Sequence, residues 1–117
     1  MEIREAVEKD LQALLKLYTE LHDNAMPERN EALLKLWTNI FLDKNHHIIV
    51  AEEDGQIVSS CVLVIILNLT HNQRPYALIE NVITANAYRR RGLAFACLEH
   101  AKQIARQNGC YKIIKLC

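Results

Sequence analysis

The segment best suited to chemistry is a basic turn that contains a glycine. Arg89, Arg90 and Arg91 precede Gly92, and an apolar helical pattern begins directly after it. The first amides of a helix have no intrahelical acceptor, and the helix dipole adds roughly half a positive charge at the same end. Gly92 permits close backbone approach, so amides and guanidinium groups together suit a diphosphate. The sequence therefore predicts an anion site at the start of this helix.

Two better-known phosphate loops are excluded by the residues that are missing. A P-loop needs Gly-Lys-Ser or Gly-Lys-Thr and the dinucleotide fingerprint needs three glycines, and the chain has neither pattern. From the residues alone, two other interpretations stay open: a solvated, charged helix start, and part of a nucleic-acid surface. Fourteen basic residues balance fourteen acidic residues, so no net field favours a polyanion or an anionic membrane.

The elements around the turn follow from the spacing of apolar residues. In chain order, the pattern predicts a strand at 3–4, helices over 11–21 and 33–41, strands at 47–50 and 57–67, a loop over 68–75 and a strand over 76–84. Asp54-Gly55 is a hairpin turn signal between the second and third of these strands. The chain therefore begins with a strand and two helices, and a meander follows.

The basic turn lies inside a predicted βαβ unit. Apolar residues between Gly92 and Asn108 recur at helical spacing, and Asn108-Gly109 is a helix stop signal. A last strand over 111–116 follows at once. The strand over 76–84, the helix and the last strand make a unit whose loop enters the helix N-terminus.

The whole chain is expected to form one domain, residues 1–117. Half of its residues are hydrophobic, which is enough for a core, and no shift of composition marks a linker or a repeat. The charged residues of Met1 to Glu5 do not suit a signal peptide, and no run approaches the ~18 apolar residues of a membrane span. A cytoplasmic protein is expected.

Cysteine and histidine spacing predicts no metal site. Cys61, Cys97, Cys110 and Cys117 form no C-x-x-C pair, so reduced and mostly buried thiols are expected. Adjacent residues of a strand point to opposite faces, which suits metal binding by His46-His47 poorly.

The basic turn resembles the cofactor loop of the GNAT family of N-acetyltransferases. Arg89-x-x-Gly92-x-Ala94 matches the signature R/Q-x-x-G-x-G/A, which in that family binds the diphosphate of coenzyme A through backbone amides. Residues 79–84 look like the family's fourth strand, residues 109–114 look like the entry to its fifth, and the order of elements is also similar. The resemblance implies an α/β (α+β) fold, with a mixed, mostly antiparallel sheet flanked by helices.

The resemblance also implies a domain that is cut short at its C-terminus, because GNAT domains continue past the fifth strand with a helix and two strands. The missing part often supplies a tyrosine that protonates the leaving thiolate, so no general acid is assigned. Within the family, the chain looks most like glucosamine-phosphate N-acetyltransferases and other small GNAT proteins. The last strand would leave an open sheet edge, for which a homodimer is a reasonable expectation.

The implied reaction moves acetyl from acetyl-CoA to a primary amine of a small molecule or peptide, in a ternary complex and without a metal. The residues expected to bind the cosubstrate are Val82, Ile83, Thr84, Arg89, Arg90, Arg91, Gly92, Leu93 and Ala94. By resemblance, a backbone N–H near Val82 or Ile83 would stabilise the oxyanion.

Glu80 is the candidate catalytic residue. An alkylamine is mostly protonated at neutral pH, so a base must take its proton, directly or through water. Alternation along the strand predicts that Glu80 shares a face with Val82 and Thr84. An ordinary salt-bridged or exposed glutamate is the alternative.

The acceptor side is expected between the first two helices, around His22, and in the loop over 68–74, where family members differ most. Tyr18 and Trp37 lie on apolar stripes and are expected in the core instead. A non-catalytic acyl-CoA-binding or interaction module is the rival to the enzyme. The identity of the amine stays open.

Overall fold

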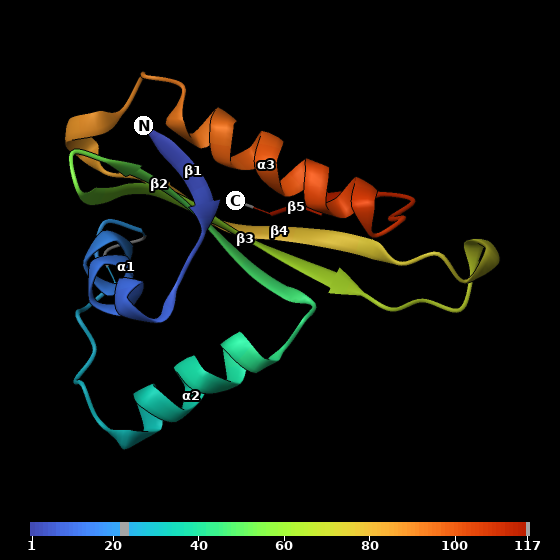
Figure 1. The fold of residues 1–117 in the computed structure, drawn as a ribbon, viewed down its shortest axis with the longest axis horizontal. Helices are drawn as coiled ribbons and strands as arrows, with labels where there is room; N and C mark the ends of the chain where they lie inside the picture. Colours follow the sequence, from blue (N-terminus) through green and yellow to red (C-terminus); the bar gives the residue numbers. More distant parts are fainter. Residues whose placement is uncertain (22–23, 117) are drawn as a thin grey trace.

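A five-stranded sheet with helices on both faces makes up the fold (Figure 1). The computed structural model describes residues 1–21 and 24–116, so His22 and Cys117 lie outside the described residues. The strands are β1 (Glu2–Glu5), β2 (His46–Glu53), β3 (Gln56–Ile66), β4 (Tyr76–Thr84) and β5 (Ile113–Lys115). The α-helices are α1 (Leu11–Tyr18), α2 (Glu31–Leu42) and α3 (Leu93–Gln107), and short 3-10 turns occupy η1 (Glu8–Asp10), η2 (His71–Gln73) and η3 (Asn86–Tyr88).

The strands lie in the sheet in the order in which they occur in the chain. Strands β1 to β4 pair antiparallel with their neighbours, and β5 pairs parallel to β4 after the α3 crossover. Asp54 and Gly55 both have positive φ, +54° and +76°, as a two-residue hairpin turn of this handedness requires. The predicted order, the hairpin and the βαβ unit are confirmed.

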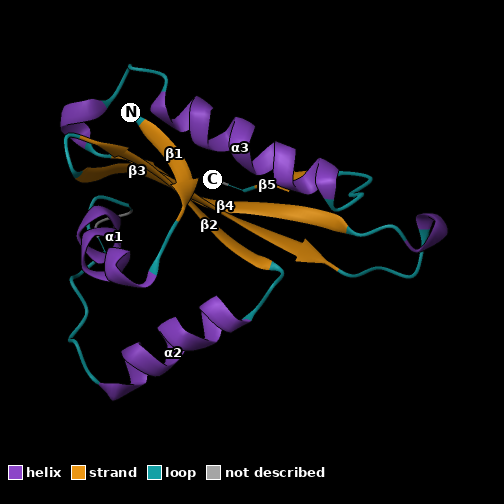
Figure 2. Ribbon diagram, viewed as in Figure 1, coloured by secondary structure: helices purple, strands orange, loops and turns teal. Residues whose placement is uncertain are grey.

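Helix α3 covers one face of the sheet and packs against it closely (Figure 2). Its buried stripe meets buried side chains of three central strands. The members of this cluster are Ile49, Ala51, Val58, Cys61, Leu63, Ile65, Ala77, Ile79, Leu93, Cys97, Ala101 and Ala105. Each is at most 4% exposed, so the start of α3 is anchored in a dense core.

Helices α1 and α2 lie on the opposite face, where the cluster of buried residues is smaller. Leu11 and Leu14 of α1 pack with Val50 and Val62 of the sheet, and Trp37 is the buried residue of α2. The indole Nε1 of Trp37 donates to the carbonyl of Glu8 at 3.1 Å. The prediction that Trp37 belongs to the core is confirmed.

Arg4 joins β1, β2 and the start of α1. Its Nη1 lies 2.7 Å from Asp10 Oδ2, and its Nη2 lies 2.7 Å from Glu52 Oε1. Burial alone would raise the pKa of Asp10, but hydrogen bonds from Arg4 and from the Val7 amide outweigh it, so this pKa is lowered. The carboxylate is therefore part of what fixes α1 to the sheet.

Several element boundaries differ from the prediction, and the first helix and the last strand are both shorter than expected. The first helix ends at Tyr18, and the amides of residues 19–21 turn to i−3 carbonyls in tighter turns instead. Strand β5 covers only residues 113–115, although Tyr111 donates to Pro75 and Leu116 to Ile79 on either side of it. Both errors arise because an apolar pattern does not show where backbone pairing stops.

The thiols of Cys61 and Cys97 are buried between the sheet and α3, as predicted, and Cys110 is half-buried. Burial raises the pKa of Cys61 to about 12 and that of Cys97 to about 11, so both thiols stay protonated at neutral pH. No described helix has the length and apolar character needed to cross a membrane. Within residues 1–21 and 24–116, no three His, Cys, Asp or Glu residues form a metal-binding group.

Candidate functional site

A cavity of about 370 Å³ lies where β4 ends and α3 begins. Its lining residues are Val82, Ile83, Thr84, Tyr88, Arg89, Arg90, Gly92, Leu93, Ala94 and Phe95. Eight of the nine residues expected to bind the cosubstrate are therefore brought together, and Arg91 is the exception. The sequence reasoning missed Tyr88 and Phe95, which flank the motif directly. Their aromatic character and their position next to the turn were the only signals for them.

A row of backbone donors faces no acceptor at the start of α3. The first amide to bond into this helix is that of Ala96, which donates to the Gly92 carbonyl at 3.0 Å. None of the amides of residues 89–95 donates to an acceptor within the described part of the chain. Because α3 is 15 residues long, its dipole adds positive potential at the same place. The turn has the donors that a bound anion needs.

The backbone of the turn enters the left-handed region twice. Gly92 has φ +76°, and Arg90 has φ +66°, which is uncommon for a residue with a Cβ. Left-handed residues of this kind occur in the backbone concavities that bind phosphates. A side chain at Gly92 would meet no atom within 4 Å, so glycine is required there by conformation rather than by space.

A bulge interrupts β4 just before the cavity. Glu80 pairs with Val62 and Ile83 pairs with Ser60, so two residues of β4 face one residue of β3. Asn81 lies in this bulge with φ +53°. A bulge leaves its extra residue outside the ladder and reverses the alternation of side chains beyond it.

The bulge overturns the predicted placement of Glu80. Val82 packs on the α3 side of the sheet, and Thr84 Oγ1 lies 2.8 Å from Ser59 Oγ on the same side. Glu80 instead shares the face of Val62, toward α1. The prediction that Glu80 shares a face with Val82 and Thr84 is wrong, because it assumed an unbroken period of two.

The carboxylate of Glu80 is exposed. The backbone of Glu80 pairs with Val62, but no hydrogen bond or ion pair joins its side chain to another described residue. Within residues 1–21 and 24–116, the carboxylate of Glu80 therefore forms no structural salt bridge.

The turn is tied to elements on both sides. The Asn86 amide donates to Glu20 Oε1 at 2.8 Å, and Arg89 Nε donates to the Thr84 carbonyl at 3.4 Å. Tyr88 separates the cavity from a second one, of about 330 Å³, which lies between α1, the β2–β3 turn and η3. The loop over 68–74, expected on the acceptor side, lies at the other end of β4 from the start of α3 (Figure 1).

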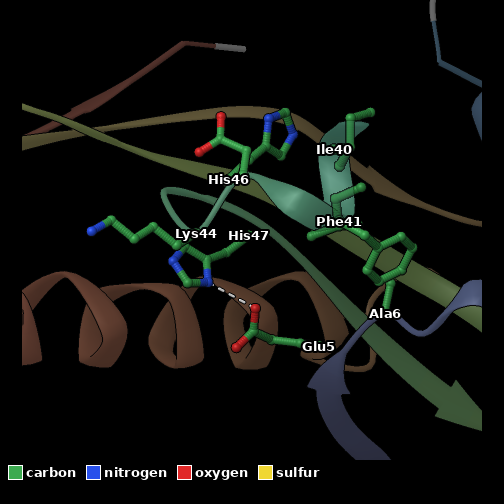
Figure 3. A pocket seen from close by; sticks show the side chains of 9 residues that line it. Glu5, Ala6, Ile40, Phe41, Lys44, His46 and His47 are labelled. Carbon is green, nitrogen blue, oxygen red and sulfur yellow. Dashed lines mark hydrogen bonds and ion pairs between the residues drawn. The ribbon is translucent and has the colours of Figure 1, made fainter. Parts of the chain in front are cut away.

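A further cavity, of about 210 Å³, lies beside the α2–β2 connection (Figure 3). His47 Nδ1 is 2.7 Å from Glu5 Oε1 there, and burial lowers the pKa of the neighbouring His46. Strands β1 and β2 place this cavity away from the basic turn, and it contains none of the residues of the motif.

The model of the acetyltransferase (GNAT) family matches residues 11–117. The chain belongs to the GNAT family. Acetyl transfer is therefore the general activity of its family, and the resemblance to that family is confirmed.

Solved structures of GNAT proteins superpose on almost the whole chain. A protein of Agrobacterium tumefaciens str. C58 that carries a provisional acetyltransferase name is 34% identical, with a TM-score of 0.93 over 100% of this chain and 81% of that one. An acetyltransferase of Trypanosoma brucei is 29% identical, with a TM-score of 0.86 over 99% and 82%. Glucosamine-6-phosphate N-acetyltransferase of Arabidopsis thaliana is 23% identical, with a TM-score of 0.90 over 99% and 81%, which shows a shared fold. The predicted fold class is confirmed.

Proposed function

We propose that this GNAT protein transfers acetyl from acetyl-CoA to a primary amine of a small molecule or peptide, by direct attack in a ternary complex. One observation carries the proposal: the amides of residues 89–95 have no described acceptor, and all of these residues except Arg91 line one cavity, two arginines among them. Such a turn is built for a diphosphate, and coenzyme A contains one. Acetyl-CoA would supply an activated acyl thioester.

The residues of the cavity fit the parts of this cosubstrate in order. The amides of the turn, with Arg89 and Arg90, would hold the diphosphate. Val82, Ile83 and Thr84 extend the cavity along β4, where the bulge frees backbone groups from the ladder. A donor near Val82 or Ile83 would stabilise negative charge on the acyl oxygen.

Glu80 is the proposed base. It lies immediately before the bulge, is exposed, and faces the side of α1 rather than that of α3. An amine that approaches from the α1 side would meet the carboxylate before it meets the thioester. Glu80 would take the proton of the ammonium form, directly or through one water, and the two substrates would already be held in place.

A transfer assay tests the proposal. The protein is incubated with acetyl-CoA and a panel of primary amines, including a sugar amine phosphate, aminoglycosides and short peptides, and the acetylated products are identified by mass spectrometry. Turnover of an amine is expected at neutral pH. Tight acetyl-CoA binding without transfer to any amine would instead favour a non-catalytic acyl-CoA-binding module.

Glu80→Gln should lower kcat by about 10²-fold at neutral pH, the usual contribution of a general base. The difference in kcat between the variant and the unchanged protein should shrink as the pH approaches the pKa of the amine, about 10, because the amine then loses its proton without a base. Glu99→Gln, an exposed glutamate of α3 that pairs with Lys102, is the matched control and should leave kcat unchanged. A pH-independent deficit would contradict the role of a base.

A further inference from the structure

Arg91 points differently from the two arginines before it. Arg89 and Arg90 line the cavity, whereas Arg91 does not. Its guanidinium lies 5.0 Å from the centre of the Tyr88 ring, and its Nη1 lies 3.8 Å from Glu53 Oε2. The three consecutive arginines therefore lie in two different environments. Arg89 and Arg90 line the cavity, and Arg91 lies against the β2–β3 hairpin.

The carboxylate beside Arg91, that of Glu53, lacks a hydrogen bond at one of its oxygens. Glu53 is the last residue of β2, directly before the hairpin turn, and its side chain is 28% exposed. Its Oε2 is inaccessible and has no hydrogen-bond partner among the described residues. A buried carboxylate oxygen without a partner is costly, and Arg91 is the cation that lies beside it. The distance of 3.8 Å leaves room for a direct hydrogen bond after a small movement.

The Glu53–Arg91 pair acts at the most strained part of the turn. Arg91 stands between Arg90 and Gly92, the two residues with left-handed backbone. A left-handed residue with a Cβ costs roughly 1–2 kcal/mol, so surrounding contacts must hold Arg90 in place. Tyr88, which stacks under Arg91, also reaches the hairpin through Gln56 Oε1 at 3.4 Å. The end of the β2–β3 hairpin is therefore the support of the turn.

We propose that Glu53 is a positioning residue for the diphosphate of acetyl-CoA. It holds Arg91 against the hairpin, and this contact keeps the backbone of residues 89–92 in the shape that aims its amides at the anion. The inference rests on the proposed function, since it assigns a role at the same site. Glu53 touches neither the cosubstrate nor the reacting atoms.

Simple electrostatics predicts the opposite effect of removing this carboxylate. A negative charge beside an anion site weakens anion binding, and its loss would also free Arg91 to join the diphosphate. Glu53→Gln should then bind acetyl-CoA more tightly. The positioning role predicts weaker binding, so the sign of the change separates the two interpretations.

The test is a double-mutant cycle by calorimetry with acetyl-CoA. Glu53→Gln and Arg91→Ala are each expected to weaken binding by about fivefold to tenfold, and the double variant should be no weaker than either single one. Arg91 is half exposed, so its variant remains informative if the Glu53 variant is unstable. Glu99→Gln should bind like the unchanged protein. The value of kcat at saturating acetyl-CoA should stay the same in all variants, while KM for acetyl-CoA should rise only in the Glu53 and Arg91 variants.

Hydrogen exchange of the ligand-free protein gives a second readout. The amides of Tyr88 and Ala96, which are hydrogen-bonded on either side of the turn, should exchange faster in Glu53→Gln than in the unchanged protein. Equal or tighter acetyl-CoA binding by Glu53→Gln, additive effects in the cycle, or unchanged exchange would overturn the positioning role. Failure of the unchanged protein to bind acetyl-CoA would overturn the proposed function instead, and the exchange rates alone would then decide whether Glu53 holds the turn.

Discussion

The two faces of the sheet differ in how completely their helices are buried. On the α3 face, twelve side chains at most 4% exposed form one cluster that anchors the first turn of the helix. On the other face, α2 buries Trp37, while Leu34, Leu36, Phe41 and Leu42 are at least 40% exposed. Helix α3 is therefore firmly packed on the sheet, whereas α2 contacts it through few buried side chains.

This difference agrees with the proposed roles of the two sides, which are cosubstrate binding at α3 and acceptor binding on the side of α1. A diphosphate held by backbone amides needs those amides fixed, and Leu93 and Cys97 root the first two turns of α3 in the core. An acceptor that binds beside the proposed base Glu80 would need no such rigidity on the α1 and α2 side. Substitutions on the two faces should therefore differ in their effects, and three of them test this difference.

The largest effect is expected in the α3 cluster. Leu63→Ala removes a side chain that is 0% exposed and leaves a cavity beneath α3. The free energy of unfolding should fall by about 2–5 kcal/mol, as measured by urea denaturation. A loss smaller than that of a surface substitution would show that this face is not the rigid one.

Asp10→Asn tests how firmly α1, unlike α2, is fixed to the sheet. Loss of the charge-assisted bond to Arg4 should cost about 1–3 kcal/mol at pH 7. Because the folded-state pKa of Asp10 is lowered, its contribution is complete above the unfolded pKa of about 3.9 and disappears as the pH falls through the folded value. The gap between variant and unchanged protein should therefore shrink below about pH 4 in thermal melts. An equal gap at pH 3 and pH 7 would contradict the assignment.

The smallest effect is expected on α2. Leu42→Ala makes the same chemical change as Leu63→Ala, but Leu42 is 77% exposed at the end of the helix. Its effect on the free energy of unfolding should stay within about 0.5 kcal/mol, and acetyl-CoA affinity should not change. A large loss would mean that another surface covers this part of α2 in solution.

The order of elements and most of the cavity could be predicted because both follow from local signals. Helical and strand periodicity, the Asp54-Gly55 turn and the Arg89-x-x-Gly92-x-Ala94 motif each act over a few residues. The bulge at Asn81 could not be predicted, since asparagine tolerates a left-handed backbone without requiring it. Its effect was to move Glu80 to the other face of β4.

The direction of Arg91 escaped prediction for a different reason. Its partner Glu53 is 38 positions away in the chain, at the end of another strand. Three consecutive arginines give no indication in the sequence of which side chain points away from the cavity. Contacts of this kind depend on the packing of the hairpin against the turn, and the sequence pattern does not contain it.

The turn at residues 89–95 is proposed to bind the diphosphate of acetyl-CoA. Calorimetric titration of the unchanged protein and of Gly92→Asp with acetyl-CoA tests this binding, because the titration needs no knowledge of the amine. Saturable binding at micromolar strength is expected for the unchanged protein. Gly92→Asp should weaken it at least about tenfold, through a negative charge and a strained left-handed residue. No binding by the unchanged protein, or equal binding by both, would contradict the account.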